Sequence, residues 1–307
     1  MTIAIGIISD VGITFASDSQ MTQGIDQKSL KSKKIFCIKT PKMQTHSDLL
    51  LAIAGDVDIA TMVVDKMEEL CKTCDFDKPS SPVDILRRAV REVKKEILEA
   101  QDATNATIDE RQAYFNRLPT SFILGFYDYG YKYQNPQPHL YSMKFAWGIA
   151  QDIKDGWCAI GGGGILAAFL MDIFYLKDIG QTPTAMTAIY VVEQVKKADL
   201  HCSGETQLWR ISRPYYPSIS HRAHKQSPAI VEATIKALSK IEPDLRVGFV
   251  DLTTGALKTL VQSAEFKALV SSPTESPPPS GQSPDVEPWL ILPPAPGHPS
   301  TPPVAPT

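Results

Sequence analysis

The order of strand and helix patterns restricts the fold of this chain more than any other feature of its sequence. Strand patterns at 2–8, 12–17, 34–38 and 49–54 are followed by helix patterns at 56–74 and 81–103; strand patterns at 121–127, 139–145 and 157–160 are followed by helix patterns at 165–175 and 182–200 and a strand pattern at 207–211. A doubly wound parallel sheet would need strict alternation of strands and helices. Runs of strands separated by paired helices instead favour an α+β fold, with two sheets face to face and helices outside.

The last third of the chain divides into structured and unstructured parts. A helix pattern begins at Ser227-Pro228, and strand patterns at 246–252 and 257–261 predict a closing hairpin. Residues 272–307 then hold 13 prolines and no Lys or Arg. Because proline cannot donate to a backbone ladder, we expect one domain over 2–270 and an extended, disordered tail over 271–307. The apolar island Trp289–Leu292 within the tail is either unused or a docking segment for a groove on this or a neighbouring subunit.

Composition excludes several classes of protein. The chain is 43% apolar and 21% charged, with a formal net charge of -3 and no polybasic run, so we expect binding neither to nucleic acid nor to a membrane surface. Its apolar stretches are shorter than the roughly 18–20 residues of a membrane helix, and the N-terminus lacks the features of a signal peptide. Five irregularly spaced cysteines favour neither a disulfide scaffold nor a metal site. These features predict a cytoplasmic protein without a bound metal.

The first candidate for chemistry is Thr2, which begins an apolar strand pattern. An initiator methionine is commonly removed when the next side chain is small, and removal of Met1 would leave Thr2 with a free α-amine beside its own hydroxyl. A hydroxyl alone is a weak nucleophile, whereas an α-amine with a pKa of roughly 7.7–8.0 can act as its general base near neutral pH. Thr2 is therefore a candidate nucleophile.

Two further residues belong with Thr2. The hairpin formed by 2–8 and 12–17 returns Asp18 to the neighbourhood of Thr2, and Lys34 opens the next strand pattern. A lysine held between an acid and a nucleophile would stabilise a developing alkoxide charge and keep the amine neutral. The alternative interpretation is a surface ion pair, which contributes only ~0–1 kcal/mol.

The spacing of these three residues resembles that of the proteasome β-subunit family and its bacterial relatives, which are N-terminal-nucleophile hydrolases. In that family an aspartate and a lysine follow the nucleophilic threonine by 16 and 32 residues, as Asp18 and Lys34 follow Thr2 here. Three local segments also match: Ala-Ser-Asp-Ser at 16–19, Lys-Ile-Phe at 34–36 and Ala-Ile-Ala-Gly-Asp at 52–56. The resemblance covers residues 2–212 and implies a four-layer αββα sandwich.

The resemblance also assigns roles to the strand that ends at Gly55. It implies that the backbone N–H of Gly55 donates to the oxyanion, for which a residue without a side chain is suited. Ile53 and Val57 flank Gly55, and the resemblance makes them walls of an apolar substrate pocket.

The second half of the chain departs from the family pattern at several positions. The segment Ala159–Gly164 fits a glycine-rich turn of the family, but Gly162 stands where the family usually has a serine that organises the catalytic amine. Asp199 and Ser203 resemble the family's supporting aspartate and serine, with one residue more between them. Gln20 stands where an arginine is common.

The resemblance implies a threonine endopeptidase that cleaves peptide or unfolded-protein substrates through an acyl-enzyme, requires no cofactor and works inside a homo-oligomeric ring. The sequence does not identify an ATPase or other regulator. Two alternatives stay open. Gly162 and the 199–203 spacing favour a catalytically weak or inactive scaffold subunit, whereas the inserted loop 102–118 and the extra segment 213–270 would suit an amidase acting on a small molecule.

Overall fold

The computed structural model describes most of the chain between Thr2 and Val247. The gaps in the description are residues 11, 24–26, 30–31, 40–47, 74–80, 102–105, 129–135, 178–179 and 214–222. The predicted tail 271–307, its island Trp289–Leu292 and the domain boundary at residue 270 all lie outside the described residues, so these expectations stay predictions.

The first sheet is antiparallel and carries the N-terminal hairpin at its centre. Its strands are β10 (Trp157–Ile160), β1 (Ala4–Ser9), β2 (Gly12–Ser17), β11 (Gln207–Ser212) and β12 (His224–Lys225), in that spatial order. Ala4 pairs with Ser17 on β2 and with Ile160 on β10. The start of β1, the end of β2 and the end of β10 therefore lie side by side at the same end of the sheet.

The second sheet is also antiparallel and follows the order of its strands in the sequence. It contains β5 (Ile35–Ile38), β6 (Leu49–Ala54), β7 (Ser121–Asp128), β8 (Gln137–Lys144) and β9 (Ala150–Asp152). A separate two-stranded ribbon is formed by β3 (Met21–Gln23) and β4 (Gln27–Ser29).

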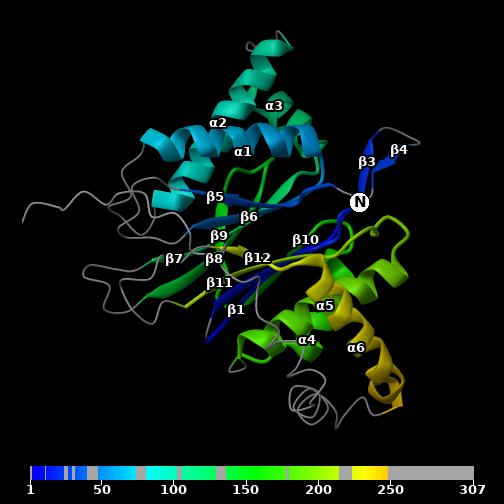
Figure 1. Ribbon diagram of the computed structural model, residues 1–307. Helices are drawn as coiled ribbons and strands as arrows, with labels where there is room; N and C mark the ends of the chain where they lie inside the picture. The colour runs from blue at the N-terminus through cyan, green and yellow to red at the C-terminus, as the bar shows by residue number, and fades with distance from the viewer. Residues whose placement is uncertain are drawn as a thin grey trace, which may run out of the picture. The chain divides into compact units, whose positions relative to one another are not determined.

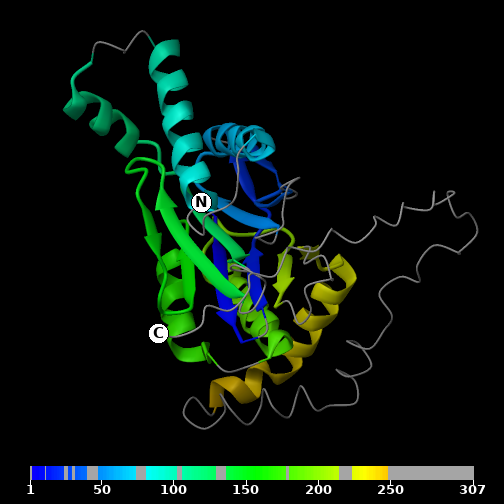
Figure 2. The same cartoon turned by 90° about the vertical axis from the view of Figure 1, so that its left-hand side faces the viewer.

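Helices cover the outer face of each sheet, as Figure 1 shows. The second sheet is covered by α1 (Val57–Thr73) and α2 (Ser81–Ala100), with α3 (Ile108–Asn116) beside them; the first sheet is covered by α4 (Gly164–Phe174), α5 (Gln181–Ala198) and α6 (Pro228–Val247). Figure 2 shows the two sheets face to face between these helix layers. The predicted α+β fold with four αββα layers is confirmed.

Alternating side chains explain why the two sheets stack. Successive residues of a strand point to opposite faces, so Ile3, Ile5 and Ile7 pack against the helices of their own sheet. Ala4, together with Ile13 and Phe15 of β2, packs between the sheets. Phe15 is fully buried there. The core thus consists of two helix–sheet layers and one layer between the sheets.

Several parts of the chain differ from the sequence-based expectations. The short strands β3, β4, β9 and β12 were not predicted. Helix α3 occupies much of the segment 102–118 that was expected to be a loop, and it begins with a capping box in which Thr107 and Glu110 each accept a hydrogen bond from the other's backbone N–H. Helix α6 continues to Val247, so the strand predicted from residue 246 is wrong where it begins. The rest of that predicted hairpin lies outside the described residues. No described helix combines the length and the apolar character needed to cross a bilayer.

Candidate active site

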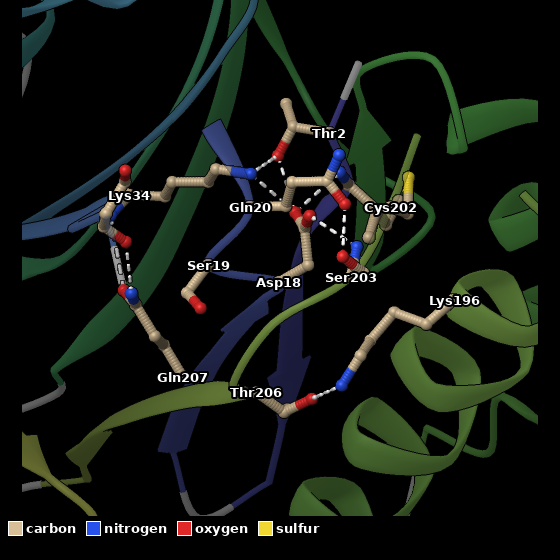
Figure 3. Close-up of polar contacts among 12 residues, drawn as sticks. Thr2, Asp18, Ser19, Gln20, Lys34, Lys196, Cys202, Ser203, Thr206 and Gln207 are labelled. Carbon is tan, nitrogen blue, oxygen red and sulfur yellow. Dashed lines mark hydrogen bonds and ion pairs between the residues drawn. The ribbon is translucent and has the colours of Figure 1, made fainter. Parts of the chain in front are cut away.

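Three sequence-predicted residues meet at the ends of three strands. Thr2 lies just before β1, Asp18 just after β2 and Lys34 just before β5. The hairpin register places Asp18 beside the start of β1, where its backbone N–H donates to the carbonyl of Ile3 at 3.3 Å. Two residues of the first sheet and one of the second therefore converge in a single site (Figure 3).

Each of these three side chains forms a hydrogen bond to both of the others. The Thr2 hydroxyl donates to Asp18 Oδ1 at 2.5 Å, and Lys34 Nζ donates to the same oxygen at 2.7 Å and also to Thr2 Oγ1. The backbone N–H of Ile3 donates to Asp18 Oδ1 at 3.0 Å. The residues are only 5%, 0% and 2% exposed for Thr2, Asp18 and Lys34, so the contacts lie largely out of water.

Burial and charge have opposite effects on Lys34. Burial lowers the pKa of the Lys34 ammonium below its usual value of 10.5, because desolvation disfavours the charged form. The neighbouring Asp18 carboxylate partly offsets this effect through its charge and its hydrogen bond. A lysine in this environment is a charged donor to Thr2 Oγ1 that releases its proton more readily than a solvated lysine does.

Gln207 holds the backbone of Lys34, and the sequence alone gave no signal for it. Its side-chain Oε1 accepts from the Lys34 backbone N–H at 3.2 Å, while its Nε2 donates to the carbonyl of Ser32 at 2.5 Å. Gln207 is the first residue of β11 in the first sheet, whereas Lys34 leads into the second sheet. One side-chain amide therefore joins the two sheets next to the site.

The segment 199–203 contributes to the site through one of its two predicted residues. Ser203 donates its backbone N–H to Asp18 Oδ2 at 3.2 Å, and its hydroxyl donates to Gln20 Oε1. The backbone N–H of Gln20 donates in turn to the Ser203 carbonyl at 2.9 Å. Asp199 instead accepts from the backbone of His201 at 2.9 Å and from the thiol of Cys202 at 3.6 Å, within its own turn.

Cys202 lies close to the same carboxylates and was not singled out from the sequence. Burial, followed by the charges of Asp18 and Asp199, raises the pKa of its thiol to about 12. A thiol with such a pKa stays protonated near neutral pH, so Cys202 lacks the thiolate character of a nucleophilic cysteine.

Two glycines that line the cavity beside Thr2 have a positive φ and close backbone neighbours. Gly55 follows β6 with φ of 105°, and a Cβ placed there would lie 1.9 Å from the carbonyl oxygen of Pro119. Gly161 has φ of 98°, and its Cβ would lie 2.1 Å from the carbonyl oxygen of Thr2. That same Thr2 carbonyl accepts from the N–H of Gly163 at 3.3 Å. Both positions require a residue without a side chain.

Thr2 and Gly55 line one cavity of about 1010 Å³, together with Leu118, Lys144, Trp147 and Ile165, among others. Ile53 and Val57, predicted as pocket walls, do not belong to this lining. Ile53 is 2% exposed and packs in the core beneath the helices, because its side chain points to the face opposite to those of its neighbours in β6. Val57 is half-buried at the start of α1. A role of Ile53 and Val57 in substrate binding therefore has no support from this cavity and stays a prediction.

No protein-family model and no curated protein matches the sequence. Solved structures do match the fold. A mutant of Anbu from Hyphomicrobium sp. strain MC1 is 17% identical and aligns with 80% of this chain and 97% of its own, with a TM-score of 0.60. Anbu from Yersinia bercovieri, described as an ancestral beta-subunit, is 14% identical over 80% and 96% of the two chains, with a TM-score of 0.60. Anbu from Pseudomonas aeruginosa, solved as a helical assembly, is 18% identical over 80% and 95%, also with a TM-score of 0.60.

These similarities define the fold and correct the family that the sequence suggested. The chain has the N-terminal-nucleophile hydrolase type of fold that is found in the Anbu proteins. The expected membership of the proteasome β-subunit family is wrong, since these structural neighbours are proteasome-like in fold but form a distinct family. The spacing of Thr2, Asp18 and Lys34 was a guide to the fold rather than to that family.

Proposed function

We propose that this chain is a threonine-type hydrolase that cleaves peptide bonds through Thr2. The observation that carries the proposal is the mutual contact of Thr2 Oγ1, Asp18 Oδ1 and Lys34 Nζ at the wall of a cavity. A hydroxyl that contacts both a buried ammonium and a carboxylate is placed for activation, and the adjoining cavity offers space for a substrate.

The first step is activation of Thr2. Once Met1 is removed, the α-amine of Thr2 accepts the proton of its own hydroxyl, directly or through a water molecule. The Lys34 ammonium stabilises the negative charge that develops on Oγ1, and Asp18 keeps the lysine in place. Ser203 supports the arrangement through its N–H bond to the second oxygen of Asp18.

The second step is acyl transfer. Thr2 Oγ1 adds to the substrate carbonyl carbon, and the N–H of Gly55 donates to the resulting oxyanion; loss of one such donor typically costs about 10²–10³ in kcat. The C–N bond then breaks, and the leaving amine takes the proton held by the Thr2 α-amine. Water, deprotonated by the same amine, attacks the ester and releases the acid and free Thr2. No cofactor takes part.

The substrates that we propose are peptides or unfolded proteins in the cytoplasm. We also propose that copies of the chain assemble into a homo-oligomer. The Pseudomonas aeruginosa Anbu, which shares the fold, is described as a helical assembly. The sequence leads us to expect a closed ring, whereas this neighbour forms a helical array, and native mass measurement combined with electron microscopy would distinguish the two assemblies.

A second candidate function is that of a catalytically weak or inactive assembly subunit on the same fold. Two observations favour it. Gly162, which lines the cavity, brings no hydroxyl towards the amine of Thr2. Asp199 bonds within its own turn, to His201 and Cys202. A site with fewer groups around the α-amine would have a poorer general base.

Intact mass spectrometry, epoxyketone labelling and cleavage of a fluorogenic peptide test the peptidase proposal. Intact mass spectrometry shows whether Met1 is removed, because the mechanism has no base if it stays. A peptide epoxyketone, which reacts with both the hydroxyl and the amine of an N-terminal threonine, is expected to label wild type and Thr2→Ser but not Thr2→Ala. The exposed residue Thr61 on α1 supplies the control variant Thr61→Ala, which should be labelled like wild type. Correct removal of Met1 without labelling or peptide cleavage would favour the scaffold.

A further inference from the structure

The cavity beside Thr2 has an uneven distribution of charge. Lys144, the last residue of β8, is exposed and lines this cavity, and none of the described residues that line it is Asp or Glu. Lys144 has no ion pair with any residue in the described part of the chain. Since an unpaired cation on a cavity wall attracts anionic groups, the cavity favours a ligand with negative charge.

The remaining lining offers apolar contact next to this cation. Leu118, Trp147 and Ile165 contribute large apolar side chains. Trp147 is 59% exposed and Ile165 is 87% exposed, so both offer apolar surface that a bound ligand would cover. A ligand that suits this wall combines an apolar group with an anionic one.

The start of helix α4 also makes the electrostatic potential in the cavity more positive, to a smaller extent than Lys144. Its first residues Gly164 and Ile165 line the cavity, its N-cap Gly163 makes no side-chain cap, and its first turn contains no acidic residue. The N–H groups of Gly163 and Gly164 donate to the carbonyls of Thr2 and Gly161, and the aligned peptide dipoles still give the start of the helix a partial positive charge. This charge strengthens the field of Lys144 but would not define a site alone.

We infer that the cavity binds a substrate segment in which a carboxylate lies next to an apolar side chain, and that Lys144 selects the carboxylate. The inference rests on the proposed function, because it places this segment beside Thr2 as the attacking group. The carboxylate comes either from a Glu or Asp side chain or from the free end of a peptide. Lys144 therefore sets specificity and takes no part in bond cleavage.

Binding is tested in the Thr2→Ala variant, so that cleavage plays no part. Three probes differ only in the carboxylate: acetyl-Ala-Leu-Glu-amide carries it on a side chain, acetyl-Ala-Leu-Gln with a free carboxyl end carries it at the terminus, and acetyl-Ala-Leu-Gln-amide has none. Quenching of Trp147 fluorescence reports occupancy, and Trp147→Phe assigns the signal to this wall. At least one acidic probe is expected to bind about five- to tenfold more tightly than the neutral one, with the preference weakening at high salt.

Variants of Lys144 test the residue itself. Lys144→Met should abolish the preference, and Lys144→Glu should reverse it, so that the neutral probe binds more tightly than either acidic probe. The matched control is Lys236→Met, which removes an exposed lysine from α6 and should change nothing. Preference for the side-chain probe indicates recognition within a peptide, whereas preference for the free acid indicates recognition of a peptide end.

The inference is overturned if all three probes bind Thr2→Ala equally, if Lys144→Met keeps the preference, or if Trp147→Phe leaves the fluorescence response intact. Failure of the peptidase proposal would look different. In that case wild type would bind the acidic probes selectively, yet matched fluorogenic peptides would stay uncleaved.

Discussion

The side-chain carbonyl of Gln207 accepts a hydrogen bond from the backbone N–H of Lys34, and this bond crosses from one sheet to the other (Figure 3). The same side chain donates to Ser32, so both ends of its amide bind the segment that contains Lys34 and leads into β5. Asp18 contacts the ammonium at the other end of Lys34. Lys34 is thus held at its backbone by one strand of the first sheet and at its tip by another.

Replacing Gln207 tests this positioning role. Gln207→Leu keeps a side chain of similar size but leaves the Lys34 N–H and the Ser32 carbonyl without their partner, so we expect a loss of about 1–3 kcal/mol in the free energy of unfolding. We also expect at least about tenfold slower epoxyketone labelling of Thr2, because small misplacements of a reacting group are costly. Denaturant titration and labelling kinetics measure the two effects.

The control for Gln207 is Gln151→Leu, which makes the same change at an exposed position of β9. If Gln207 acts only on stability, Gln207→Leu will label at the wild-type rate wherever both proteins are folded, and its pH profile will match that of wild type. A shifted alkaline limb in that profile is the expected sign that the environment of Lys34 has changed.

The pH dependence of activity should reflect two groups. The rate is expected to rise with pH as the Thr2 α-amine loses its proton near roughly 7.7–8.0, and to fall again when Lys34 loses its charge. Because burial lowers the pKa of Lys34, the fall should begin below 10.5. In Lys34→Arg, which keeps its charge at high pH, any residual activity should lack this alkaline limb. Steady-state kcat/KM measured from about pH 6 to 11 decides between these outcomes.

The lowered pKa of Lys34 also makes the free energy of unfolding depend on pH. Between the lowered folded pKa of Lys34 and the unfolded value of 10.5, the unfolded chain binds more protons than the folded one, so this group makes stability rise with pH through that window. Lys34→Met should remove this rise. It should also destabilise the protein near neutral pH, because Asp18 would keep its buried charge without a cationic partner. Unfolding followed at several pH values would contradict the account if both proteins showed parallel curves.

Some of the site could be predicted because short-range geometry determines it. A tight hairpin returns its second strand beside its first, so the ends of 2–8 and 12–17 had to bring Asp18 near Thr2. The periodic patterns likewise predicted the longer strands and every helix except α3. They did not predict the short strands β3, β4, β9 and β12. The polar sequence of α3 shows no clear apolar periodicity, so the helix was not predicted, although Thr107 and Glu110 have the spacing of a capping box.

Other parts of the site depend on packing that the sequence does not show locally. Gln207 meets Lys34 across 173 positions of the chain, and a glutamine at the start of a strand has no signature of its own. Ile53 was expected in the pocket because it neighbours Gly55, but adjacent residues differ in the face they occupy, and Ile53 faces the helices. The actual lining came from Lys144, Trp147 and α4, which only the tertiary fold brings to Thr2.

Gly55 and Gly164 form a matched pair for testing whether the backbone near the site tolerates a side chain. Gly55→Ala would place a Cβ 1.9 Å from the Pro119 carbonyl oxygen in a backbone with φ of 105°, so we expect a loss of at least about 2 kcal/mol and impaired labelling of Thr2. In Gly164→Ala the nearest atom to the new Cβ would be 3.6 Å away, at the start of α4. That variant should match wild type or gain up to about 1 kcal/mol. Equal stability of the two variants would refute the strain at Gly55.

The contact of Gly125 with Phe15 sets the spacing of the two sheets that share the site. A Cβ at Gly125 would lie 2.5 Å from the ring of Phe15, which is fully buried between the sheets. Gly125→Ala should therefore cost about 1–3 kcal/mol through overpacking. Phe15→Leu alone should cost about 1–3 kcal/mol through a cavity.

The double variant Gly125→Ala with Phe15→Leu should lose less stability than the sum of the two single variants, because the smaller side chain accepts the new methyl group. We expect a coupling of at least about 1 kcal/mol by denaturant titration, whereas Gly125→Ala combined with the exposed Thr61→Ala should be additive within about 0.5 kcal/mol. Each single variant should also slow the labelling of Thr2, and the double variant should restore it, since Thr2 and Asp18 flank strands of one sheet and Lys34 precedes a strand of the other. Additive losses in the first pair would mean that this contact does not control the distance between the sheets.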